Sequence, residues 1–147
     1  MKTIALFILS LFFAIFFPLD VGAQQTIGQP SILNYYHEDI NAGSQNWAIK
    51  QDKFGNMYFA NNTGLLTYNG KEWKMYRLPN KTIVRAICIT DDLKIFVGGQ
   101  DALGYFFPDE RGVLQYHSLL ELLPLNKRKF GDVWNIEILN NDIFFRT

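Results

Sequence analysis

Residues 46–70 read NWAIKQDKFGNMYFANNTGLLTYNG, and residues 84–108 read VRAICITDDLKIFVGGQDALGYFFP. A shift of 38 positions aligns the first stretch with the second, without a gap from Trp47 to Tyr68. A third copy begins at Val133-Trp134, after a longer interval. A period of about 40 residues is typical of a supersecondary unit that is stacked many times.

Each copy carries short apolar and aromatic runs that are separated by turn sequences. The first copy predicts strands at 46–51, 57–61, 65–68 and 72–78, and the second predicts strands at 84–89, 95–98, 103–107 and 113–117. Turns such as Asn62-Thr63-Gly64 and Asn69-Gly70 supply residues that tolerate positive φ, as tight hairpins require. Four antiparallel strands in about 40 residues predict an all-β fold built from β-propeller blades. Only Leu119–Leu125 has the pattern of a helical turn.

The repeat divides the chain into predicted parts. They are a signal peptide at 1–23, a lead-in at 24–43 whose residues 32–36 could form a closing strand, a first blade at 44–80, a second blade at 81–118, an insertion at 119–131 and the start of a third blade at 132–147. A propeller closes with roughly 4–8 blades, whereas about two and a half are present here. The repeat count therefore predicts that the chain is the N-terminal fragment of a longer protein.

The first 23 residues have the pattern of an export signal. Lys2 gives a positive start, residues 4–17 are apolar, and Val21-Gly22-Ala23 resembles a cleavage site. A membrane-spanning helix needs roughly 20 apolar residues, so this run is short for an anchor, although an uncleaved anchor is the alternative. The residue directly after the cleavage site is Gln24 and not a cysteine, so a lipoprotein is not indicated. We therefore expect an exported, periplasmic chain that begins near Gln24.

Composition and motifs exclude several classes of site. With 14 Lys and Arg against 14 Asp and Glu, the chain lacks the basic footprint of a nucleic-acid or membrane-surface binder. The single cysteine, Cys88, cannot form an internal disulfide, and His37 and His117 lack partners at metal-ligand spacing. Neither a phosphate-binding glycine loop nor a Ser–His–Asp arrangement is indicated. We expect no enzymatic activity, cofactor or metal in this chain.

Three aligned residues are the candidate ligand-binding positions. Trp47, Arg85 and Trp134 each fall at the start of the first strand of a copy, which is the innermost strand of a propeller blade. One interpretation places them near the mouth of the central channel, where aromatic and guanidinium groups could hold a sugar-like ligand. The other interpretation is packing between blades, because Ile49, Ile87 and Ile136 share one strand face. The sequence leaves both open.

The first copy also resembles a known repeat. Its Asn46-Trp47-Ala48-Ile49, Met57-Tyr58-Phe59-Ala60, Thr63-Gly64-Leu65-Leu66 and Tyr68-Asn69-Gly70 are similar to the two-component-regulator propeller repeat. The second copy is a poorer match, because Phe106-Phe107-Pro108 replaces the Tyr-Asn-Gly turn and the hairpin glycine is missing. The lead-in, with its Gly28-Gln29-Pro30, resembles the start of such sensors in Bacteroidetes.

That resemblance implies a periplasmic sensor of two seven-bladed propellers and a triple-tyrosine β-sandwich. One transmembrane helix would then lead to a histidine kinase or a helix-turn-helix output domain. The expected function is ligand sensing, of a small molecule such as a carbohydrate, within a membrane-bound regulator of signal transduction and transcription. The expected partners of this segment are the remaining blades and the β-sandwich. Two alternatives are a fragment of a secreted propeller lyase or glycosidase, and a truncated remnant without function.

Overall fold

The computed structural model describes Gly28 and residues 31–147. The predicted signal peptide at 1–23 therefore lies outside the described residues. Within the described part, no helix is long and apolar enough to span a membrane. The chain divides into a unit of residues 1–33 and a unit of residues 34–147. In the first unit, the described residues form neither strand nor helix, and every strand described below lies in the second.

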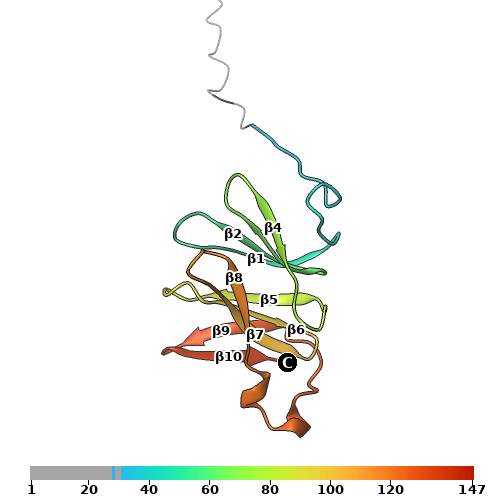
Figure 1. Ribbon diagram of the computed structural model, residues 1–147, viewed down its shortest axis with the longest axis vertical. Helices are drawn as coiled ribbons and strands as arrows, with labels where there is room; N and C mark the ends of the chain where they lie inside the picture. The colour runs from blue at the N-terminus through green and yellow to red at the C-terminus, as the bar shows by residue number, and fades with distance from the viewer. Residues whose placement is uncertain (1–27, 29–30) are drawn as a thin grey trace, which may run out of the picture. The chain divides into compact units, whose positions relative to one another are not determined.

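Two four-stranded antiparallel sheets and one hairpin follow each other along the second unit (Figure 1). The strands of the first sheet are β1 (Asn46–Gln51), β2 (Met57–Asn61), β3 (Gly64–Tyr68) and β4 (Trp73–Tyr76). Those of the second sheet are β5 (Val84–Ile89), β6 (Ile95–Gly99), β7 (Ala102–Pro108) and β8 (Leu114–Ser118), and the hairpin consists of β9 (Asn135–Leu139) and β10 (Asp142–Arg146). Each strand pairs with its neighbour in sequence, so the predicted all-β fold with blade-like sheets is confirmed.

The sequence also predicted regular structure in two segments outside the sheets. The predicted helical turn at Leu119–Leu125 is a pair of short 3-10 helices, η1 (Leu120–Leu122) and η2 (Leu125–Lys127). Residues 32–36 form no strand in the described structure, and their pairing with a last blade stays a prediction. Tyr35 instead packs edge-on against Trp73 and shares a 2.9 Å hydrogen bond between hydroxyl groups with Tyr68. Tyr35 thus covers part of the outer face of the first sheet.

The core lies between the sheets. One cluster joins Tyr58, Ala60 and Leu65 of the first sheet to Ile87, Val97 and Phe106 of the second, among other residues. A second cluster joins Ala86 and Phe96 of the second sheet to Ile136 of the hairpin and to Val133, which lies just before β9. The second sheet is therefore buried on both faces, and all five residues of β6 are buried. Burial of apolar surface is the main stabilising contribution here.

Two glycines permit the close approach of neighbouring segments to β6. A Cβ atom on Gly98 would lie 2.4 Å from Cγ1 of Val133, and one on Gly99 would lie 1.9 Å from the carbonyl oxygen of Ile83. Both distances are far below van der Waals contact. The absence of side chains at these two positions therefore allows the segments that lead into β5 and β9 to cross β6.

A buried asparagine fixes the entry to the first sheet. The Asn61 side chain is fully buried, and its Oδ1 accepts hydrogen bonds from the amides of Gly43 and Thr63. Its Nδ2 donates to the carbonyl oxygens of Gly43 and Gln45 and to Oδ1 of Asn46. These contacts, of 2.8–3.1 Å, tie the lead-in to the turn between β2 and β3. Every polar atom of the amide group is thereby satisfied without water.

Asn61→Asp tests this network. The carboxylate would place a buried negative charge against three oxygen acceptors, so we expect the free energy of unfolding to fall by about 2–4 kcal/mol. Urea denaturation at pH 7 measures the change. Asn34→Asp, which adds the same charge at an exposed position of the lead-in, is the control and should have little effect. Equal stability of the two variants would contradict the network.

Candidate functional site

The structure brings the three predicted positions together. Trp47 lies on β1, Arg85 lies on β5, and Trp134 directly precedes β9. The guanidinium carbon of Arg85 is 4.2 Å from the centre of the Trp47 ring and 4.8 Å from that of Trp134. The two indole rings are 6.4 Å apart and inclined at 76°. We call these three residues the Trp–Arg–Trp cluster.

A β-bulge in each of the two four-stranded sheets contributes to this convergence. Asn46 and Ala48 face the consecutive residues Asn61 and Ala60, which leaves Trp47 as the extra residue. In the same way, Val84 and Ala86 face Gly99 and Gly98, which leaves Arg85 as the extra residue. Bulges re-aim a side chain relative to the regular alternation of a strand, and they are common beside functional sites.

Trp134 occupies the position in the third copy of the repeat that corresponds to Trp47 and Arg85. Its amide donates a 2.8 Å hydrogen bond to the carbonyl of Arg146, the residue that pairs with Asn135. Trp134, just before β9, and Asn135, its first residue, thus both lie beside Arg146 of β10. The cluster is therefore a product of the repeat itself, with one residue contributed by each of three successive units.

An acidic residue that the sequence analysis did not identify completes the cluster. Oδ1 of Asp132 lies 2.9 Å from Nε of Arg85, and the two side chains are only 24% and 17% exposed. The N–H direction is not aligned with the carboxylate, so the contact is an ion pair without a hydrogen bond; Nη1 of Arg85 is also buried without a partner. Arg85 is therefore held by charge and by stacking, which together favour one fixed position.

The two indoles remain accessible around this charged centre. Trp47 is 39% exposed and Trp134 is 51% exposed. Trp47 is also oriented by a 2.7 Å hydrogen bond from its Nε1 to Oδ1 of Asn62. Stacking on the indoles and hydrogen bonds to the charged groups are the interactions that this arrangement can offer a ligand.

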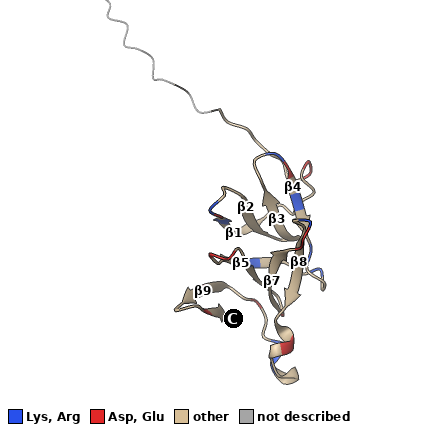
Figure 2. Ribbon diagram, turned by 60° about the vertical axis from the view of Figure 1, so that its left-hand side comes forward, with Lys and Arg blue, Asp and Glu red and all other residues tan. Residues whose placement is uncertain are grey.

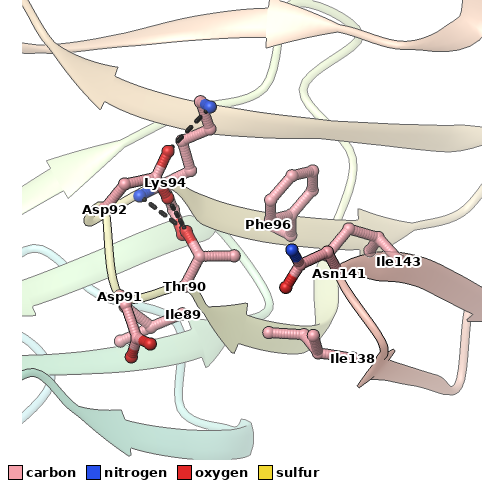
Figure 3. A pocket seen from close by; sticks show the side chains of 9 residues that line it. All are labelled: Ile89, Thr90, Asp91, Asp92, Lys94, Phe96, Ile138, Asn141 and Ile143. Atoms are coloured by element: carbon pink, nitrogen blue, oxygen red, sulfur yellow. Dashed lines mark hydrogen bonds and ion pairs between the residues drawn. The ribbon is translucent and has the colours of Figure 1, made fainter.

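A hollow of about 560 Å³ lies at the opposite ends of the same strands, between the β5–β6 and β9–β10 turns. Figure 3 shows the Asp92–Lys94 ion pair on one side of this hollow and Asn141 on the other. Hydrogen bonds from Lys94 and Thr90 lower the pKa of Asp92 to about 2, so this carboxylate stays charged and paired at neutral pH. Figure 2 shows acidic and basic residues interspersed over the described part of the chain.

The turn between β1 and β2 is organised by a single carboxylate. Asp52 accepts hydrogen bonds from the amides of Phe54 and Asn56, from Nδ2 of Asn56 and from the hydroxyl of Tyr58. Burial raises the pKa of Asp52, but these hydrogen bonds together outweigh burial and hold the pKa below its usual value. The charged form of Asp52 therefore stabilises the folded hairpin.

No family model, curated protein or solved structure matches this chain. The similarity to the two-component-regulator propeller repeat therefore stays a prediction that rests on the residues of the first copy.

Replacing Asp52 should change how stability depends on pH. Because the folded pKa lies below the unfolded value of about 4, the stabilisation is present above that value and is lost as pH falls through the folded pKa. We expect Asp52→Asn to lower the free energy of unfolding by about 1 kcal/mol at pH 7. Between pH 7 and pH 3, the free energy of unfolding should fall less in this variant than in the wild type. Urea denaturation at both pH values measures this difference. The control is Asp91→Asn, in the exposed β5–β6 turn. If the free energy of unfolding of both variants changes equally between pH 7 and pH 3, the stabilising role of charged Asp52 is refuted.

Proposed function

We propose that this chain is the N-terminal part of an extracytoplasmic β-propeller sensor. In this proposal the Trp–Arg–Trp cluster binds a small polyhydroxylated molecule such as a carbohydrate. The sensor belongs to a membrane-bound regulator of signal transduction and transcription of the two-component type, and the export signal predicted at 1–23 directs it to the periplasm. The observation that carries the proposal is the convergence of one residue from each of three successive units on the Arg85 guanidinium.

The chemistry of the cluster supports this class of ligand. Trp47 and Trp134 are partly exposed, and an indole provides flat apolar surface that can stack on the C–H face of a pyranose ring. The adjacent Arg85 and Asp132 carry opposite charges, so one site contains both a hydrogen-bond donor group and an acceptor group. A hydroxyl group can interact with both. A neutral sugar suits the pair better than an anion, because Asp132 would repel a negative charge.

The position of the cluster also supports a role in signalling. A ligand that stacks on Trp47 and Trp134 contacts the first and third units at the same time. Such a ligand binds more tightly to an arrangement of units in which both rings are correctly spaced. That difference in affinity is what a ligand needs in order to shift a conformational equilibrium.

Oligosaccharide titrations test the proposed site. Cellohexaose, xylohexaose and mannohexaose are titrated into the chain, and binding is followed by calorimetry. We expect at least one of them to bind, and Trp134→Ala to weaken that binding by about tenfold or more. Phe54→Ala removes another exposed aromatic ring, 69% exposed and outside the cluster, and should leave the affinity unchanged.

The same variants separate ligand binding from packing between units. If Trp47→Ala and Trp134→Ala bind the sugar as the wild type does but unfold at lower denaturant concentration, the cluster serves packing alone. If none of the three sugars binds, the carbohydrate assignment is wrong.

A further inference from the structure

The backbone around Asp132 is held against the turn between β6 and β7. Asp132 forms an isolated antiparallel bridge with Gln100, and the amide of Val133 donates a 3.1 Å hydrogen bond to the carbonyl oxygen of Gly99. Gly99 ends β6, and Gln100 directly follows it. The carboxylate of Asp132 therefore reaches Arg85 from a backbone that the second sheet holds in place.

A second carboxylate, that of Asp101, fixes the residues directly before Asp132. Its Oδ1 accepts hydrogen bonds of 2.8 Å from the amides of Phe130 and Gly131. The amide of Asp101 also donates a 2.8 Å hydrogen bond to the carbonyl oxygen of Gly131. Hydrogen bonds to an ionised acceptor are stronger than those between neutral groups. Three contacts of one residue thus anchor the end of the insertion and set the place from which Asp132 extends.

The charge balance of the Trp–Arg–Trp cluster depends on Asp132. Among the described residues, its carboxylate is the only acidic group within ion-pair distance of Arg85, at 2.9 Å. Both side chains are half-buried, and charges at such positions are screened less than in water. Without this carboxylate, the cluster would be a guanidinium between two indoles, an arrangement that attracts a carboxylate ligand. With it, the same ligand meets a fixed negative charge.

We propose that Asp132 is the specificity-determining residue of the Trp–Arg–Trp cluster and that Asp101 is its positioning residue. Asp132 favours neutral sugars and rejects sugars that carry a carboxylate, such as uronic acids, because a like charge beside a bound anion is unfavourable. Asp101 acts through the backbone that carries Asp132. This inference rests on the proposed function, since it defines which sugars the same site accepts.

Mannohexaose and hexamannuronate form a matched pair of probes, because the second has the backbone of the first with a carboxylate on each sugar. Both are titrated by calorimetry into the full chain at one low ionic strength, since salt screens the repulsion. We expect the wild type to bind hexamannuronate more weakly than mannohexaose. Asp132→Asn removes the charge and keeps the shape of the side chain, so its affinity for hexamannuronate should exceed that of the wild type by about tenfold or more. Asp91→Asn, in the β5–β6 turn, makes the same change in net charge and should show no such gain.

Two substitutions of Asp101 test its positioning role. Asp101→Ala removes the acceptor of the two amide hydrogen bonds, so its affinity for hexamannuronate should rise by about threefold or more relative to mannohexaose. Asp101→Asn keeps an acceptor oxygen and should bind both sugars as the wild type does. The control is Asp109→Ala, because Oδ1 of Asp109 accepts two amide hydrogen bonds of 2.9 Å in the β7–β8 turn. It should lower stability without changing the ratio of the two affinities.

The role of Asp132 is overturned if Asp132→Asn binds hexamannuronate no more tightly than Asp91→Asn does, or if the wild type binds hexamannuronate as tightly as mannohexaose. The second result needs no variant, and Asp101→Ala measures the gain independently, so the test stays decisive even if Asp132→Asn does not fold. The role of Asp101 is overturned if its alanine and asparagine variants show the same ratio of affinities. If the wild type binds none of the neutral sugars while Asp132→Asn gains affinity for hexamannuronate, the proposed function fails and the exclusion of anions by Asp132 stands.

Discussion

The structure depends on one constraint: each sheet carries apolar side chains on both faces, and both faces must be covered. The second sheet meets this requirement, because the first sheet covers one face and the β9–β10 hairpin covers the other. Among the described residues, the first sheet has one such neighbour, and five of the six residues of β1 are exposed. Tyr35 of the lead-in covers part of its free face by packing on Tyr68 and Trp73. In repeat proteins, the interfaces between neighbouring units contribute a large part of the stability of each unit.

The same requirement produces the candidate site. Stacking the units brings the starts of their inner strands together, and the bulge found in each of the first two units turns one side chain out of the regular alternation. Where three such side chains meet, a cation lies between two indoles. Packing between units and ligand binding are therefore compatible roles, because the half-buried Arg85 and Asp132 can hold the units while the more exposed Trp47 and Trp134 contact a ligand.

The sequence predicted the strands well, because periodicity and turn residues are local signals. β1, β2 and β5 begin and end at the predicted residues, and the alignment of copies placed Trp47, Arg85 and Trp134 at equivalent positions. Asp132 could not be found in this way, since the equivalent positions hold Gln45 and Ile83. Asn61 was also missed, because its partners are mainly backbone groups of the segment before β1 and of the β2–β3 turn, where no periodic pattern marks them. Contacts made once, by a single copy, leave no repeated signal.

The most direct test of this account is an NMR measurement on the Arg85 side chain. If the guanidinium lies between two indoles, ring currents will shift the δ and ε protons of Arg85 upfield, and cross-relaxation peaks will connect them to both Trp47 and Trp134. Arg85→Lys provides the assignment by removing these signals. Ordinary chemical shifts without a cross-peak to either indole would contradict the stacking of the three units on which the site and its proposed function depend.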